Sequence, residues 1–141
     1  MELLFSTTKF IVLYLATGIF GFLVSLVWSP FGTSVGASGA VLGLIGILIG
    51  ATFHHGRAGK AYRGELVRWV IYIFVIGLLF RTDNAAHLGG LTAGVALGYF
   101  VPEGEPATHT SDKVWNTLAV LSVLIIAGSF ALMALQINRP L

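Results

Sequence analysis

The stretch that decides the fold is Gly36–Gly46, which reads GASGAVLGLIG. Its glycines, continued by Gly50, recur at alternating spacings of three and four residues. Residues at this spacing share one face of a helix, so the stretch predicts a helix with a face free of side chains. In a membrane such a face lets a second helix backbone approach closely. A single serine, Ser38, stands at the start of this run and calls for an explanation.

The composition around this stretch places the protein in a membrane. The 141 residues are 56% hydrophobic and only 10% charged, whereas soluble domains carry about 25% charged residues. The mean hydropathy of +0.89 agrees with this. A soluble chain of this size cannot bury so much apolar surface in one core. Because backbone polar groups in lipid must be satisfied internally, we expect an all-α, polytopic membrane bundle.

We expect residues 1–141 to form a single membrane domain. Five apolar stretches in it are candidate transmembrane helices. They run roughly over residues 10–28, 36–53, 66–80, 86–101 and 115–136. The first is too long for a signal peptide and no small-residue cleavage site follows it, so we expect it to be retained.

The basic residues predict the orientation of these helices. With the N-terminus in the cytoplasm, six of the eight Lys and Arg residues lie on the cytoplasmic side, as the positive-inside rule requires. Those six are Lys9, Arg57, Lys60, Arg63, Arg68 and Lys113. Since no targeting extension is visible, a bacterial or archaeal cytoplasmic membrane is the expected location.

This topology brings two polar residues to the same depth. The stretch Asn84–Gly94, NAAHLGGLTAG, begins the fourth apolar segment and holds His87 near its outer end, at the depth of Ser38. It also holds Gly90 and Gly94, which form a second small-residue face. If the two glycine faces pack together, Ser38 and His87 face each other. The alternative is that both faces are ordinary helix-packing surfaces.

A serine and a histidine at one depth suggest nucleophilic catalysis. A serine needs a base to accept its proton, and imidazole suits that role. The one carboxylate near this depth, Asp83, lies in the predicted outer loop, so a Ser–His dyad is expected rather than a triad. Taken alone, Ser38 could instead bond back to a helix carbonyl, and His87 could be wetted at the surface.

Other functions fit the residues less well. A small transporter or channel subunit that used His87 and Asp83 as a proton path would carry further polar residues along its helices. Almost no polar residue follows His87 in its segment except Thr92. His54 and His55 adjoin the basic segment and are expected at the membrane interface, while His109 falls in a polar stretch. The chain has no cysteine, which excludes thiolate chemistry and disulfides. The grouped basic residues suit membrane orientation better than a nucleic-acid partner.

These motifs resemble a known family. Gly36-Ala37-Ser38-Gly39 resembles the GxSG motif of rhomboid intramembrane serine proteases, and Asn84–Gly94 resembles their AHxxGxxxG helix. Tyr14–Gly21 is similar to the helix that precedes the serine helix. The resemblance covers nearly the whole chain. It implies a six-helix core of which the first four segments here are the third to sixth helices, with the last segment an added C-terminal helix.

The resemblance also implies an activity. Ser38 would be the nucleophile and His87 the general base in hydrolysis of peptide bonds in or near transmembrane segments of other membrane proteins. The Ser38 N–H would join the oxyanion hole, and Gly36, Gly39, Gly90 and Gly94 would serve that site and helix packing. The implied partners are transmembrane protein substrates within the lipid bilayer, and no metal or other cofactor is implied.

Two departures from the family pattern set an alternative beside the protease. The first two core helices, with a histidine–asparagine pair and a Trp-Arg loop, have no counterpart here. Leu42 stands where many members carry an aromatic residue, one helical turn after the serine. The alternative is a catalytically inactive, rhomboid-like pseudoprotease or fragment that binds membrane clients.

Overall fold

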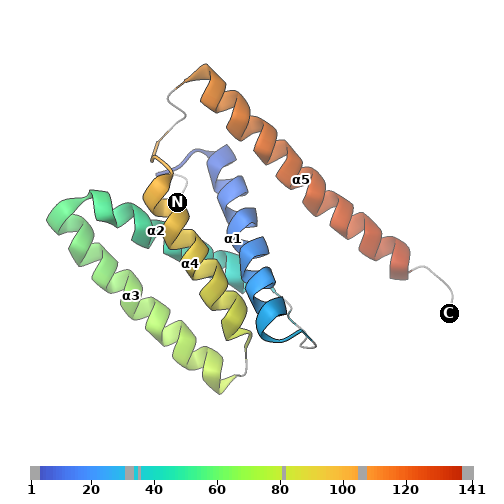
Figure 1. Cartoon of the computed structure of the whole chain (residues 1–141), viewed down its shortest axis with the longest axis horizontal. Coiled ribbons are helices and arrows are strands. Elements are labelled where there is room, and N and C mark those ends of the chain that lie inside the picture. The colour runs from blue at the N-terminus through green and yellow to red at the C-terminus, as the bar shows by residue number, and fades with distance from the viewer. Residues whose placement is uncertain (1–3, 31–33, 35, 81, 105–107, 138–141) are drawn as a thin grey trace.

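The computed structural model describes residues 4–30, 34, 36–80, 82–104 and 108–137. In this part of the chain every regular element is helical, which confirms the all-α prediction (Figure 1). The elements are α1 (Thr7–Trp28), α2 (Ser38–Ala51), the short 3₁₀ helix η1 (Thr52–His54), α3 (Gly56–Leu79), α4 (Asn84–Phe100) and α5 (His109–Ile137).

The centre of the fold is the packing of α2 against α4, with α1 lying against both (Figure 1). The two glycine faces meet in this seam. A Cβ atom added at Gly90 would strike the carbonyl oxygen of Gly39, and one added at Gly94 would strike that of Gly43. Any side chain at these positions would therefore push the two backbones apart.

Helix α1 completes a three-helix core by the same principle. The side chain of Thr17, which is fully buried, occupies the space that a Cβ at Gly43 would need. Its hydroxyl donates to the carbonyl of Leu13 at 2.9 Å, so this buried hydroxyl is satisfied within α1. Gly21 lies against the carbonyl oxygen of Ala86 on α4.

Two helices begin well before the apolar segments that predicted them. Helix α3 starts at Gly56 rather than near 66, because the basic stretch contains no proline that would interrupt a helix. An exposed ion pair joins Arg68 to Glu65 at 2.8 Å within it. Helix α5 starts at His109 rather than near 115. The Thr108 hydroxyl accepts a hydrogen bond from the Ser111 N–H at 3.1 Å, which is N-capping geometry.

The apolar surface is distributed as a membrane helix bundle requires. Within the described ranges, α1 and α5 are the two helices long and apolar enough to cross a bilayer, and Ser38–His54 is apolar but shorter. Helix α5 contacts α1 near its start and otherwise exposes its apolar side chains, as Leu124 and Phe130 do. The assignment of the five predicted segments as membrane spans remains a prediction.

Candidate active site

Ser38 is placed by the start of α2. Gly36, two residues earlier, has a φ of 121°, a conformation that glycine adopts freely and that turns the chain into the helix. Ser38 is the first residue of α2, and the first hydrogen bond that closes a turn there runs from the Val41 N–H to the Ala37 carbonyl at 3.0 Å. The earlier N–H groups of this helix end therefore have no partner within the helix.

His87 is placed by the start of α4. Asp83 caps this helix: its carboxylate accepts a hydrogen bond from the Ala86 N–H at 2.9 Å, and its carbonyl accepts one from the His87 N–H at 3.1 Å. The side chain of His87 points into the bundle and the residue is only 4% exposed. A buried imidazole in the first turn of a helix is costly unless it has a polar partner.

That partner is Ser38. The Oγ atom of Ser38 lies 2.8 Å from Nε2 of His87, within the range for a nucleophile and its base. The pair lies at the head of the α2–α4 seam, where Gly39 and Gly90 bring the two backbones into contact. The side chains of Ser38 and His87 reach each other because these glycines allow the two backbones to lie this close.

The four glycines of the predicted site divide by position. Gly39, Gly90 and Gly94 line the seam and are helix-packing residues in this structure. Gly36 lies outside the seam, where a Cβ would meet no atom within 4 Å, and supplies the turn before Ser38. A part for Gly36 or Gly39 in an oxyanion hole remains a prediction.

The carboxylate of Asp83 accepts hydrogen bonds from groups on α1 and α4 rather than from the ring of His87. Its carboxylate accepts a short hydrogen bond from the Ser25 hydroxyl on α1, and Nδ1 of His87 has no hydrogen-bond partner in the described residues. Burial raises the pKa of Asp83, but hydrogen bonds from Ser25, Ser34 and the Ala86 and Ala85 N–H groups outweigh it. The pKa therefore lies below its ordinary value of 3.8.

Phe74 on α3 is a contact of His87 that sequence reasoning missed. The two rings are nearly perpendicular, at 85°, with centroids 6.1 Å apart. Leu42 is almost fully buried, at 2% exposure, but offers no ring. No sequence signal identifies Phe74, because its contact depends on the angle between α3 and α4.

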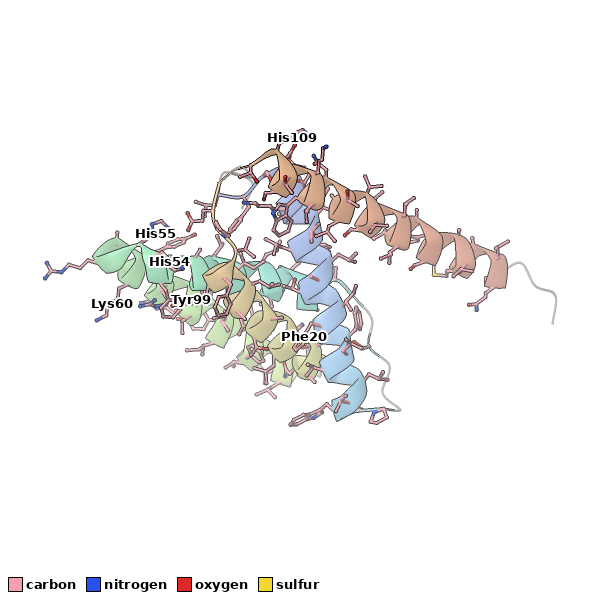
Figure 2. All side chains as sticks on the ribbon, turned by 45° about the horizontal axis from the view of Figure 1, so that its top comes forward. Phe20, His54, His55, Lys60, Tyr99 and His109 are labelled. Carbon is pink, nitrogen blue, oxygen red and sulfur yellow. The ribbon has the colours of Figure 1, made fainter. Side chains whose placement is uncertain are left out.

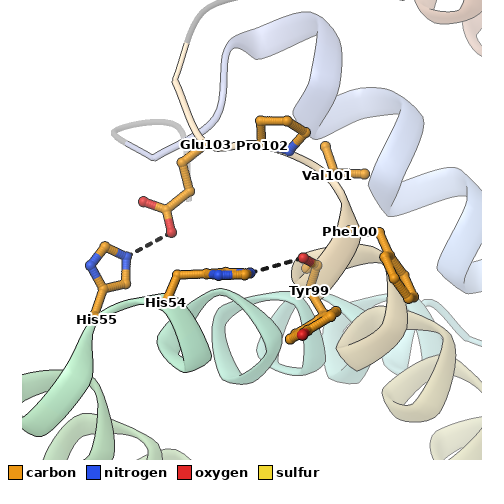
Figure 3. A pocket seen from close by; sticks show the side chains of 8 residues that line it. His54, His55, Tyr99, Phe100, Val101, Pro102 and Glu103 are labelled. Atoms are coloured by element: carbon orange, nitrogen blue, oxygen red, sulfur yellow. Dashed lines mark hydrogen bonds and ion pairs between the residues drawn. The ribbon is translucent and has the colours of Figure 1, made fainter.

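His54 and His55 lie at the opposite end of α2, where it passes into α3 near Lys60, whereas His109 begins α5 (Figure 2). His54 stacks on Tyr99 at 5.0 Å between centroids and its Nε2 lies 3.0 Å from the Tyr99 carbonyl oxygen. Nε2 of His55 lies 2.7 Å from the Glu103 carboxylate (Figure 3). These residues line an open cavity of about 390 Å³, away from Ser38.

Among the described residues, no group of three or more His, Asp or Glu side chains is placed to hold a metal ion.

The comparison with known proteins settles the family. The family model for the Rhomboid domain matches residues 1–104, which hold both glycine faces, Ser38 and His87. The chain belongs to the rhomboid family. It is therefore a membrane protein with a helical bundle, as its apolar helices α1 and α5 also indicate.

Curated relatives of this rhomboid domain include active and inactive proteins. "RHOMBOID-like protein 1" of Arabidopsis thaliana is 34% identical over 105 residues, 70% of this chain and 26% of its own length. "Rhomboid protease GluP" of Bacillus subtilis is 34% identical over 99 residues, 67% of this chain and 19% of its own length. "Inactive rhomboid protein 2" of Homo sapiens is 32% identical over 141 residues, 96% of this chain and 16% of its own length.

The lengths and names of these relatives limit what family membership implies for this chain. The chain spans about a quarter or less of the length of the three rhomboid proteins just named. Since both proteases and inactive members match, membership alone does not assign an activity. No solved structure matches the chain. Helix α5 lies outside the matched rhomboid residues, so its identification as an added C-terminal helix remains a prediction.

Proposed function

We propose that this chain is the catalytic part of an intramembrane serine endopeptidase that uses a Ser38–His87 dyad. The observation that carries the proposal is the 2.8 Å contact between Ser38 Oγ and His87 Nε2, held at the head of the α2–α4 seam. A packing serine needs no histidine, and a buried histidine is rare within a membrane bundle unless it serves a function.

The geometry supports acyl transfer through a covalent intermediate. Ser38 Oγ attacks the scissile carbonyl carbon while His87 Nε2 accepts the hydroxyl proton. The tetrahedral intermediate collapses, the C–N bond breaks, and His87 returns the proton to the leaving amine. Water then attacks the ester carbonyl while His87 accepts one of its protons. The ester C–O bond breaks, His87 returns the proton to Ser38 Oγ, and the carboxylate product leaves. The free N–H groups at the start of α2 are suited to stabilise the oxyanion.

The substrates proposed are transmembrane segments of other membrane proteins. Gly36 precedes Ser38 by two residues, and a Cβ there would meet no described atom within 4 Å, so an extended substrate backbone is proposed to lie on this side of Ser38. Because the dyad sits at the end of α2 opposite the basic start of α3, the positive-inside rule puts it near the outer face when the N-terminus is cytoplasmic. A cut near that face, in the cytoplasmic membrane of a prokaryote, is the expected reaction.

A second candidate is a rhomboid pseudoprotease that binds membrane clients without cleaving them. It is favoured by the match to the human inactive rhomboid protein, which covers 96% of this chain. The two candidates differ in one measurable property, the reactivity of Ser38.

The test is labelling by a fluorophosphonate probe, which reacts with an activated serine. The full chain is purified in detergent, and its helical content is checked by circular dichroism before labelling. We expect labelling that is lost in Ser38→Ala and reduced at least about a hundredfold in His87→Ala. Ser122→Ala and His109→Ala are the matched controls, since these residues lie on α5 away from the dyad.

The opposite outcome is equally informative. If the folded chain does not label, or if labelling persists in Ser38→Ala, the chain by itself is not a serine protease. Client binding is then the function to pursue.

A further inference from the structure

Helix α3 meets α4 at the outer end, beside the dyad. A Cβ at Gly77 would strike the side chains of Asn84 and Thr82, so glycine permits this close approach. The Thr82 N–H donates to the Gly77 carbonyl at 2.9 Å and closes the turn between the helices. Phe74 lies one helical turn before Gly77, at the position from which α3 reaches His87.

The ring of His87 has few groups that fix its plane. Its Nε2 contacts Ser38, but its Nδ1 has no hydrogen-bond partner within the described chain. The nearby carboxylate of Asp83 is occupied by the Ser25 hydroxyl and the Ala86 N–H. A single hydrogen bond only partly fixes the side-chain torsions of His87, so the packing around the buried ring also sets its plane.

Phe74 supplies that packing. Its ring stands at 85° to the imidazole with centroids 6.1 Å apart, which is the edge-to-face arrangement that aromatic pairs prefer. Helix α2 cannot provide a ring at the equivalent place, because the residue one turn after Ser38 is Leu42. Phe74 is half-buried, whereas Phe80, near the end of the same helix, is 76% exposed.

We propose that Phe74 is the positioning residue of the dyad: its ring holds the His87 imidazole in the plane that directs Nε2 at Ser38. The proposal rests on the function proposed above, since it assigns Phe74 a part in the same site. It predicts that any aromatic ring placed against His87 can hold the imidazole in this plane, whether the ring comes from α3 or from α2.

The experiment measures the rate at which the fluorophosphonate probe labels Ser38 in the full chain. Phe74→Leu is expected to lower this rate about three- to tenfold, the value of one aromatic pair. Phe74→Tyr keeps a ring and is expected to label within about twofold of the parent chain. Phe80→Leu is the matched control and is expected to change nothing, because that ring is exposed.

A rescue variant separates positioning from general packing. In the double variant Phe74→Leu with Leu42→Phe, the ring comes from α2, one turn from Ser38, and we expect labelling to recover. Thermal unfolding of every variant, followed by tryptophan fluorescence, shows which changes affect folding alone. Labelling of folded Phe74→Leu at the parent rate would overturn the proposal.

A second readout keeps the proposal independent of activity. If the parent chain does not label, the proposed function fails while the ring contact is still measurable by NMR of ¹³C-labelled histidine. The His87 ring signals, assigned with His87→Ala, are expected to shift in Phe74→Leu and to stay in place in Phe80→Leu. Unchanged His87 signals in Phe74→Leu would refute the positioning role.

Discussion

The carboxylate of Asp83 joins the Ser25 hydroxyl on α1 to the Ala86 N–H at the start of α4. One short side chain thus caps the helix that carries His87 and ties it to a neighbouring helix. The contact lies one helical turn from the histidine, so the position of the imidazole depends on a residue that does not touch it.

We therefore expect Asp83→Ala to destabilise the protein by about 1–2 kcal/mol, the usual cost of a lost N-cap. Asp83→Asn keeps one oxygen that can accept from the Ala86 N–H, and its amide NH2 can donate to the Ser25 hydroxyl, so it is expected to cost clearly less. Ser25→Ala removes the link to α1 but leaves the cap, so its loss should lie between these two. Thermal unfolding in detergent measures all three, and an unchanged midpoint for Asp83→Ala would show that the cap carries no stability.

The low pKa of Asp83 predicts a pH dependence of stability. Its pKa in the folded chain lies below the ordinary 3.8 because of its hydrogen-bond donors, so the folded state binds this proton less tightly than the unfolded state. The stabilisation is complete above 3.8 and is lost as the pH falls through the lower, folded pKa. Unfolding midpoints recorded from pH 6 down to pH 3 are expected to drop less in Asp83→Asn. Parallel curves would mean that Asp83 does not titrate abnormally.

The α2–α4 seam predicts a sharp difference between glycines. Gly94→Ala places a Cβ against the carbonyl oxygen of Gly43, and the resulting overpacking is expected to cost about 1–3 kcal/mol. Gly128→Ala is the matched control, since Gly128 lies in α5 with open space around it, and should be neutral or stabilising. The comparison uses unfolding midpoints, and an equal response of the two variants would contradict the close packing of this seam.

Lys9 predicts a stabilising contact at the other end of the bundle. This residue is 3% exposed, and its ammonium group donates to the carbonyls of Pro102 at 2.9 Å and Gly104 at 2.8 Å. Lys9→Met keeps the apolar stem but leaves both carbonyls without this donor, at an expected cost of about 1–3 kcal/mol. Lys60→Met, at an exposed position, should leave the melting midpoint unchanged. Equal unfolding midpoints for the two variants would show that the hydrogen bonds of Lys9 do not stabilise the fold.

The sequence by itself determined the helical class and the pairing of two glycine faces, and it predicted that Ser38 and His87 would face each other. These features are periodic or follow from hydropathy and charge, which are properties of neighbouring residues. The starts of helices were harder to predict, because α3 and α5 begin in polar stretches that hydropathy does not mark as helical. At α5 the start depends on the cap that Thr108 provides.

Only the tertiary structure decided which groups surround the histidine. The contact of Phe74 with His87 and the link from Asp83 to Ser25 join residues on different helices. Their formation depends on the turn at Thr82 and on the angle at which α1 and α3 meet α4, and no local pattern encodes an angle between helices. The spacing of residues therefore predicted that Ser38 and His87 meet, and only packing decided which groups surround them.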